Sequence, residues 1–131
     1  MSKHSLHLGK NFEKSVFFSL GVVTSGKLLY TAGITARDAD GAVVGKGDMR
    51  AQVRQCFANL DDIIKAAGGT WERVVKYTIY TTRIHEFNEN TRDIRSAYFC
   101  DRPAATLIEV SKLIDPDMLV EIEAIVALDE K

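Results

Sequence analysis

The clearest pattern of hydrophobic positions lies between Asp48 and Gly68, where apolar residues recur at intervals of three and four. That spacing places one apolar stripe along a helix. The stripe consists of Val53, Cys56, Phe57, Leu60, Ile63, Ile64 and Ala67. Aspartate is a preferred N-cap and glycine a common stop, so Asp48 and Gly68-Gly69 bound the element well. We therefore predict an amphipathic helix between Asp48 and Gly68.

Alternation with a period of two predicts the strands. In RVVKYTIYTT, residues 73–82, the side chains of Val75, Tyr77 and Ile79 alternate with Lys76, Thr78 and Tyr80, as in a strand with one buried face. The other predicted strands cover 16–23, 27–36, 105–110 and 118–128.

A hairpin and a second helix complete the predicted elements. Asp-Ala-Asp-Gly at 38–41 is a turn signal, and it predicts a hairpin that pairs the second strand with residues 42–45. A helix is predicted over 88–100, with Asn88 as its cap and Arg102-Pro103 as its stop. The residues expected to face inward are Thr91, Ile94, Ala97 and Tyr98.

These elements define the fold class as α+β. Their order is βββαβαββ, which predicts one domain over residues 1–131, with a mixed sheet and two helices on one face. The other face of the sheet has nothing to cover it. We therefore expect the chain to associate with other subunits through that face.

Composition excludes several classes of partner. The chain carries 17 Lys and Arg against 18 Asp and Glu, and no basic run is interleaved with aromatic residues, so we expect neither nucleic acid nor an anionic membrane as a partner. The segment MSKHSLHLGK lacks the apolar stretch of a signal peptide. Cys56 and Cys100 form no disulfide framework or C-x-x-C pair, which favours a cytoplasmic location.

No common catalytic motif is present: there is no G-x-S-x-G, P-loop, H-E-x-x-H or G-x-G-x-x-G. His4 and His7 lie in a polar segment without a third ligand, and His85 is interpreted as an ordinary loop residue. Cys56 lies on the apolar stripe and is interpreted as a core residue, and Cys100 has no histidine beside it in sequence. We expect neither a metal nor a cofactor.

The carboxylates of the last two strands are the more informative candidates. In residues 118–128, Glu121 and Glu123 project from one face, while Val120, Ile122 and Ala124 form the natural core face. Glu121 and Glu123 therefore point to solvent or to a partner subunit. The alternative is that both are rim charges paired across strands, with Lys76 as a possible partner.

The run RPAATLIEV at 102–110, followed by VEIEAIVAL at 120–128, resembles the C-terminal signature of the RidA/YjgF family, also called L-PSP endoribonuclease-like. The likeness extends over most of the chain, through YTAG at 30–33, KAAGG at 65–69 and VVKYTIYTT with the following HEF. The resemblance implies a chorismate-mutase-like architecture. It also implies a homotrimer with ligand clefts between subunits.

The chemistry implied by the resemblance is hydrolysis of reactive enamines and imines, such as 2-aminoacrylate, to a keto acid and ammonia. Glu121 matches the carboxylate that orients water or moves a proton. Members with this activity carry, after Pro-Ala, an arginine that binds the substrate carboxylate. Here that residue is Ala105, so we expect a substrate other than 2-aminoacrylate. Removing such a charged contact should weaken handling of small imino acids by about tenfold to a hundredfold.

The other substrate-binding positions implied by the resemblance also differ from the family pattern. Leu107 replaces a small residue or cysteine, Ala32 replaces a serine, and Phe17 or Phe18 replaces a tyrosine. The full set of predicted substrate-binding residues is Phe18, Ala32, Ala105, Thr106 and Leu107.

Some expected groups have no clear counterpart. For the asparagine of the second helix the nearest residues are Thr91 and Arg92. Arg102 should lie on the wrong side of the strand to replace the missing cation, whereas Arg37 or Lys27 could enter a cleft.

Three functions remain open. The first is hydrolysis or deamination of a different enamine or imine, with Glu121 as acid and base. The second is a non-catalytic trimer that binds a metabolite or has a regulatory role. The third is a ribonuclease, against which the net charge of −1 and the lack of a histidine pair both argue.

Overall fold

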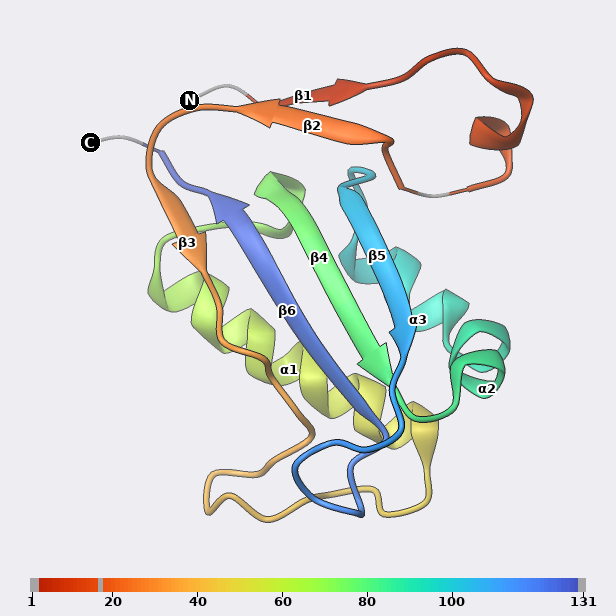
Figure 1. The fold of residues 1–131 in the computed structure, drawn as a ribbon. Helices are drawn as coiled ribbons and strands as arrows, with labels where there is room; N and C mark the ends of the chain where they lie inside the picture. The colour runs from red at the N-terminus through yellow and green to blue at the C-terminus, as the bar shows by residue number, and fades with distance from the viewer. Residues whose placement is uncertain (1–2, 17, 130–131) are drawn as a thin grey trace.

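A mixed four-stranded sheet forms the centre of the computed structural model, which describes residues 3–16 and 18–129. Its strands lie in the order β3 (Leu28–Tyr30), β6 (Val120–Ala127), β4 (Val74–Thr81) and β5 (Ala104–Glu109). Strand β6 is antiparallel to both neighbours, whereas β4 and β5 are parallel (Figure 1). The predicted α+β class is confirmed.

Helix α1 (Met49–Ala66) lies across one face of this sheet, as predicted (Figure 1). The Asp48 carboxylate accepts a hydrogen bond from the Ala51 amide at 3.1 Å, and Gly68 ends the element with a φ of 79°. The buried side of α1 contains Val53, Cys56, Phe57, Leu60 and Ile64. These side chains form the core together with the inward side chains of β4 and β6.

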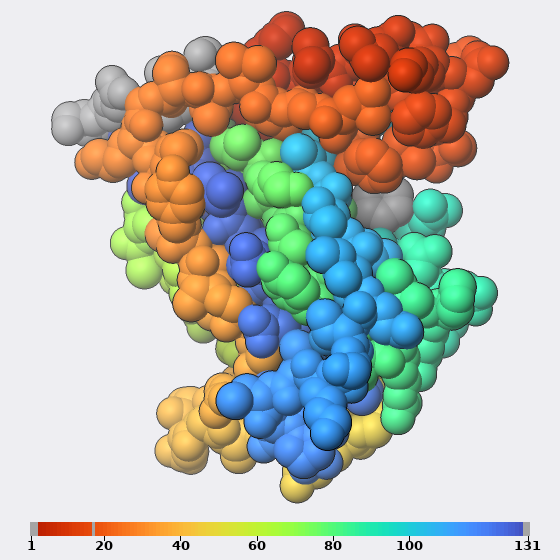
Figure 2. Space-filling model, in the orientation of Figure 1, coloured from red at the N-terminus to blue at the C-terminus, as the bar shows by residue number. Residues whose placement is uncertain are grey.

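The alternation predicted for the strands is present. In β4, Val75, Tyr77 and Ile79 are buried, and in β6, Ile122 and Ala124 are buried. We call this side of the sheet the covered face. Thr78, Tyr80, Glu121 and Glu123 project from the opposite side, which we call the open face. Figure 2 shows that no helix lies over this side of the sheet.

The prediction of a first strand at 16–23 is confirmed only for residues 21–23 and was wrong for the rest that the structure describes. The first strands are β1 (Lys3–Leu6) and β2 (Gly21–Thr24), which form a separate two-stranded sheet at one end of the molecule (Figure 1). A short 3-10 helix, Asn11–Lys14, lies between them. Residues 16 and 18–20 lie outside any strand: the carbonyls of Val16 and Phe18 accept from Arg102, and Ser19 forms an isolated bridge to Ala104. Phe17 lies outside the described residues.

The predicted hairpin forms only its turn. The Asp38 carboxylate accepts hydrogen bonds from the amides of Asp40 and Ala42, at 2.9 and 3.0 Å. A single bridge joins Arg37 to Val43, and no strand forms at 42–45. Strand β3 pairs with β6 instead, so this turn is a loop at the sheet edge.

The predicted helix over 88–100 is two shorter helices, α2 (Ile84–Asn90) and α3 (Arg92–Tyr98). They separate at Thr91, whose buried hydroxyl donates to the Phe87 carbonyl at 2.6 Å and which has a non-helical φ of −126°. A β-branched residue that bonds back in this way favours a helix break. Asn88 is therefore internal to α2 and is no cap.

The inward positions of α3 also differ from the prediction. Thr91 and Ile94 are buried and Tyr98 is half-buried, but Ala97 is exposed and Arg95 is buried in its place. A further 3-10 turn, Trp71–Arg73, precedes β4. No helix among residues 3–16 and 18–129 has the length and apolar character needed to cross a membrane.

Candidate functional site

The six predicted site residues divide between the two faces of the sheet. Phe18, Ala105 and Leu107 line one cavity on the helix side. Ala32, Thr106 and Glu121 belong to the open face or its edge. The structure therefore brings each set together but keeps the two sets apart within one chain.

The cavity on the helix side has a volume of about 380 Å³. Its apolar wall is formed by Val16, Phe18, Tyr77, Ile79, Ala105 and Leu107. Its polar wall is formed by Asn88, Arg92 and Arg95. A mostly apolar concavity of this size that contains a few polar groups is typical of a small-molecule site.

Strand pairing explains why Ala105 and Leu107 face this cavity. Ala105 is opposite Tyr77, and Leu107 is opposite Ile79, in the parallel register of β4 and β5. Because Tyr77 and Ile79 belong to the covered face, their partners do too. Position 105 carries only a methyl group, which leaves this space open.

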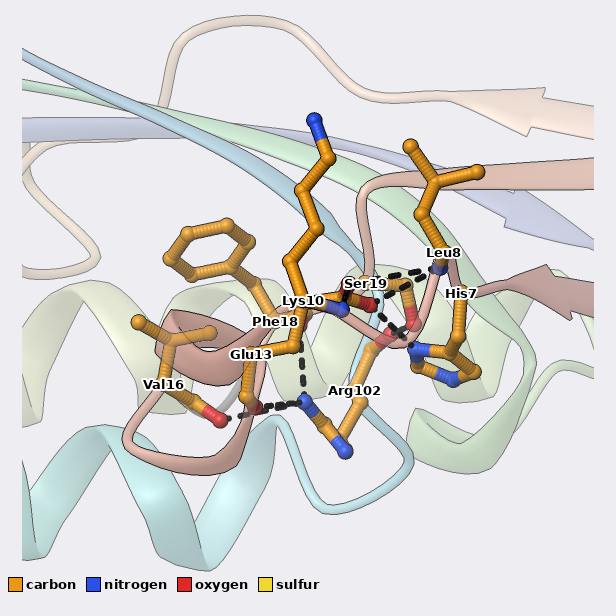
Figure 3. Close-up of polar contacts among 8 residues, drawn as sticks. All are labelled: His7, Leu8, Lys10, Glu13, Val16, Phe18, Ser19 and Arg102. Carbon is orange, nitrogen blue, oxygen red and sulfur yellow. Dashed lines mark hydrogen bonds and ion pairs between the residues drawn. The ribbon is translucent and has the colours of Figure 1, made fainter.

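Arg102 holds the loop that closes the cavity (Figure 3). Its Nη2 donates to the carbonyls of Glu13, Val16 and Phe18, at 2.9, 3.2 and 3.3 Å. The Ser19 hydroxyl donates to the Arg102 carbonyl, and Arg102 has a left-handed φ of 47°. Arg102 is therefore committed to the loop backbone and is not among the residues that line the cavity.

The other end of the same loop is fixed by a carboxylate. Glu13 is buried and accepts hydrogen bonds from the amides of Leu8 and Lys10, the second at 2.6 Å (Figure 3). His7 Nδ1 lies 3.5 Å from the same carboxylate. The amide of Lys10 is the first cause of the lowered pKa of Glu13. Backbone contacts thus order the wall that carries Val16 and Phe18.

The arginines of α3 were not predicted as site residues. Arg95 is 4% exposed, and its Nη2 donates to the Asn88 carbonyl at 2.9 Å. Its guanidinium carbon lies 4.8 Å from the centre of the Phe87 ring. Burial lowers the pKa of Arg95, while the neighbouring Tyr77 raises it and the charge of Arg92 lowers it.

A sequence signal for this polar wall was available. Asn88, Arg92 and Arg95 are four and three residues apart, which is the spacing of one helix face. Apolar periodicity assigns the inward face of a helix to its apolar residues and therefore does not predict this polar face. Arg37 and Lys27, the cations considered instead, do not line the cavity; Arg37 Nη1 donates to Gly41 within its own turn at 3.3 Å.

On the open face, Glu121 lies directly against Gly33. A Cβ atom at Gly33 would overlap the Glu121 carboxylate, so this contact requires glycine. The edge segment is held in place by paired hydrogen bonds between Ile34 and Ile122, both of 2.9 Å. Ala32, exposed beside Gly33, belongs to the same neighbourhood.

Tyr80 lies between the two carboxylates of β6. It is opposite Glu121 in the strand pairing, and Glu123 is opposite the neighbouring Thr78. The charge of Glu123 raises the pKa of Tyr80, and burial, a hydrogen bond to Glu123 and the charge of Glu121 act in the same direction. The Tyr80 hydroxyl therefore stays protonated at neutral pH and can donate to a carboxylate.

The alternative in which Lys76 pairs with the glutamates is not what the structure shows. Its Nζ donates to the Thr106 hydroxyl at 2.8 Å, and the ion pairs identified within 3–16 and 18–129 join it to neither Glu121 nor Glu123. Lys76 and Glu123 border a small groove of about 140 Å³ on the open face. Glu109, the third carboxylate, is structural: it accepts from the Ile84 amide at the start of α2, at 3.1 Å.

The remaining candidates lie outside both sets. Cys56 is buried, and burial raises the pKa of its thiol to about 12, so it is not a nucleophile at neutral pH. Cys100 is exposed. In the described part of the chain, no group of three His, Cys, Asp or Glu side chains is arranged to hold a metal ion. A larger depression of about 640 Å³, beside Asp48 and Asp93, contains none of the predicted site residues.

Comparison with known proteins identifies the family. Residues 10–128 match the family model described as Endoribonuclease L-PSP. The chain belongs to the RidA/YjgF (L-PSP) family. It is 35% identical to the RutC family protein PH0854 of Pyrococcus horikoshii, over 79% of this chain and 81% of that protein.

Solved structures of the RidA/YjgF family agree with this fold. The Rid-family protein YyfB from Yersinia pestis is 32% identical and has a TM-score of 0.87, with 98% of this chain and all of that one covered. Rv2704 from Mycobacterium tuberculosis, a YjgF/YER057c/UK114 family member, is also 32% identical, with a TM-score of 0.67 over 97% of this chain and 100% of that one. The predicted family and its chorismate-mutase-like fold are confirmed.

Proposed function

We propose that this RidA-family protein hydrolyses an enamine or imine metabolite in a cleft formed between subunits, with Glu121 as the catalytic acid and base. The observation that carries the proposal is the position of Glu121. Its carboxylate is half-buried against Gly33 on the open face and lies next to the hydroxyl-bearing Tyr80. A carboxylate in such a position is suited to orient a water molecule.

The reaction requires few groups. Glu121 accepts a proton from water as the water oxygen bonds to the imine carbon, and the C=N π-electrons move to nitrogen. Glu121 passes that proton to the nitrogen, which gives a carbinolamine. Glu121 then takes the proton of the carbinolamine hydroxyl and gives it to the nitrogen as the C–N bond breaks, so that a carbonyl compound and ammonia leave. For an enamine, protonation of carbon to give the imine comes first. One water is consumed for each imine, so atoms and charge balance.

A partner subunit has to complete this site. Glu121 and the cavity that contains Ala105 lie on opposite faces of one chain. The open face also exposes apolar surface, at Tyr30 (68% exposed) and Ile108 (41% exposed). Exposed apolar surface of this kind favours association. We propose a homotrimer in which the open face of one copy meets the β5 edge of the next.

Ala105 and Leu107 define which substrate this site would take. An alanine at 105 supplies no charge, and Leu107 adds apolar bulk to the cavity. The substrate would therefore be larger and more apolar than 2-aminoacrylate. A cytoplasmic location, where imines arise from amino-acid metabolism, is part of the same proposal.

The test is to measure ammonia and keto-acid release from freshly generated imines of different size, against the uncatalysed rate. Glu121→Gln should reduce kcat by about a hundredfold or more, because it removes the proton acceptor. Glu123→Gln, two residues along the same strand face, is the matched control and should retain most activity. Turnover that is unchanged in Glu121→Gln would exclude this function.

The second candidate is a non-catalytic trimer that binds a metabolite. It is favoured by one observation: the described residues that line the cavity include neither a carboxylate nor a thiol. Under this hypothesis the protein would bind apolar acids but release no ammonia from any imine tested.

A further inference from the structure

The cavity on the helix side takes its positive charge from α3 and none from β5. Arg92 is exposed and Arg95 is almost fully buried, and both line the cavity together with Asn88. These two arginines are the charged side chains among its described lining residues. Positively charged side chains of α3 therefore border the cavity.

We propose that Arg95, assisted by Arg92, binds the carboxylate of an apolar carboxylic acid whose hydrocarbon part fills the cavity. This inference rests on the proposed function, since it assigns the substrate class and the anchor of the same site. In this proposal, an arginine on α3 takes the role that the resemblance assigns to an arginine on β5, where this chain has Ala105.

Electrostatics favours an anion at this position. The charge of Arg92 acts on Arg95, and Arg95 is already removed from water. Two like charges near each other, one of them buried, raise the free energy of the empty site. Guanidinium groups remain protonated at neutral pH, so both charges would stabilise a carboxylate that binds beside them.

The guanidinium of Arg95 is held in a defined orientation. Asn88 accepts from its Nη2 through the backbone carbonyl at 2.9 Å and through Oδ1 at 3.3 Å. The ring of Phe87 lies against its planar face. A planar donor fixed in this way suits a carboxylate, because less side-chain entropy is lost when the ligand binds.

Tyr77 adds a second donor on the opposite wall. Burial raises the pKa of Tyr77 to about 12, so its hydroxyl is protonated at neutral pH. Its ring is fixed by stacking on Phe99, with centroids 3.7 Å apart. Because the charge of Arg95 acts on Tyr77, the two groups are neighbours.

The apolar wall determines the size and type of the hydrocarbon group that the ligand carries. Phe18, Ile79 and Leu107 face the space beside Ala105. A volume of about 380 Å³ accommodates an aromatic ring or a branched chain, which a three-carbon acid would leave largely unfilled. The ligand class is therefore an aromatic or branched aliphatic acid, and its imine would be the substrate.

The experiment uses two unreactive probes of the same shape, 3-phenylpropionate and its neutral amide 3-phenylpropanamide, with binding measured by calorimetry. The wild-type protein should bind the acid about tenfold or more tightly than the amide. Arg95→Gln should remove that preference, and Arg92→Gln should reduce it severalfold. Arg54→Gln removes an exposed arginine of α1 and should change nothing.

Two results would overturn the inference: equal affinities for acid and amide, or an acid preference that persists in Arg95→Gln. If Arg95→Gln fails to fold, Arg92→Gln and Arg95→Lys decide the question. The lysine variant keeps the charge without the planar fork, so it should retain a preference for the acid but bind it more weakly than wild type.

Failure of this inference is distinguishable from failure of the proposed function. A protein that binds the acid through Arg95 but hydrolyses no imine would refute the function alone. A protein that hydrolyses imines with full activity in Arg95→Gln would refute this inference alone.

Discussion

Ala105 and Glu121 project from opposite faces of the same four-stranded sheet. Ala105 is opposite the buried Tyr77, and Glu121 is opposite Tyr80 on the open face. The residue expected to contact substrate and the residue expected to catalyse are therefore separated by the sheet. Any site that uses both has to draw them from different subunits.

The contact between Gly33 and Glu121 predicts a variant with a selective defect. In Gly33→Ala, the new methyl group would displace the Glu121 carboxylate, which is the flexible end of its side chain. We expect imine turnover to fall by about tenfold to a hundredfold, because small misplacements of a catalytic group are costly. The free energy of unfolding should change by less than about 1 kcal/mol.

Gly21→Ala is the matched control for that variant. A Cβ at Gly21 would make only ordinary contact with Leu6, at 3.8 Å. Kinetics and urea denaturation of both variants provide the measurement. A Gly33→Ala protein with wild-type turnover would mean that the position of the Glu121 carboxylate does not limit the reaction.

The contacts of Arg102 predict that one substitution would lower both the stability of the protein and its affinity for the ligand. Arg102→Ala would leave the carbonyls of Glu13, Val16 and Phe18 without their donor. We expect unfolding free energy to fall by about 2–3 kcal/mol, since several hydrogen bonds to one charged group are lost. Binding of 3-phenylpropionate should also weaken, because Val16 and Phe18 form part of the cavity wall.

Arg102→Lys distinguishes the effect of losing the planar donor, which positions the loop, from the effect of losing the charge. Lysine keeps the charge but cannot reproduce the planar donor, so it should restore part of the stability and little of the binding. Calorimetry and urea denaturation measure the two effects. Full binding in both variants would show that the loop does not depend on Arg102.

Ala105→Arg predicts a change of substrate. A guanidinium on β5 would supply the group that binds a small carboxylate, and its side chain would occupy part of the cavity. We expect hydrolysis of 2-aminoacrylate to rise by about tenfold or more, while bulkier imines lose activity. If wild type already hydrolyses 2-aminoacrylate as fast as the variant, the alanine at 105 does not determine specificity.

The ion pair between Arg50 and Asp93 predicts acid sensitivity. Arg50 donates to both Asp93 oxygens, at 2.8 and 2.9 Å, and this hydrogen bonding lowers the Asp93 pKa to about 2. A carboxylate is stabilising when its pKa is lower in the folded state than the unfolded value of about 3.9. That stability is present above about pH 4 and is lost as pH falls through about 2.

The measurement is the urea midpoint of wild type and Asp93→Asn as a function of pH. The difference between them should be largest near neutral pH and shrink between about pH 4 and pH 2. Asp62→Asn, an exposed position on α1, is the control. A difference that does not depend on pH would mean that ionisation of Asp93 contributes nothing to the packing of α3 against α1.

Where a local pattern was strong, the sequence predicted the structure. The stripe containing Val53, Phe57 and Leu60 gave α1, and the cap at Asp48 and the stop at Gly68 fixed its ends. These features depend on neighbours within one or two turns. The alternation in β4 and β6 also predicted which face Glu121 occupies, because side chains of a strand alternate without reference to the rest of the fold.

Contacts between residues far apart in the sequence decided the structural features that local sequence patterns did not predict. The break at Thr91 involves a local bond to Phe87, four residues earlier, whereas the loop before β2 depends on Arg102, more than eighty residues away. The cavity exists only because that loop, α3 and β5 meet around Ala105. By itself, the sequence determined α1, the alternation of β4 and β6, the family and the face on which Glu121 lies. Only the tertiary structure decided where the charges of Arg92 and Arg95 lie, since burial and proximity come from packing distant segments together.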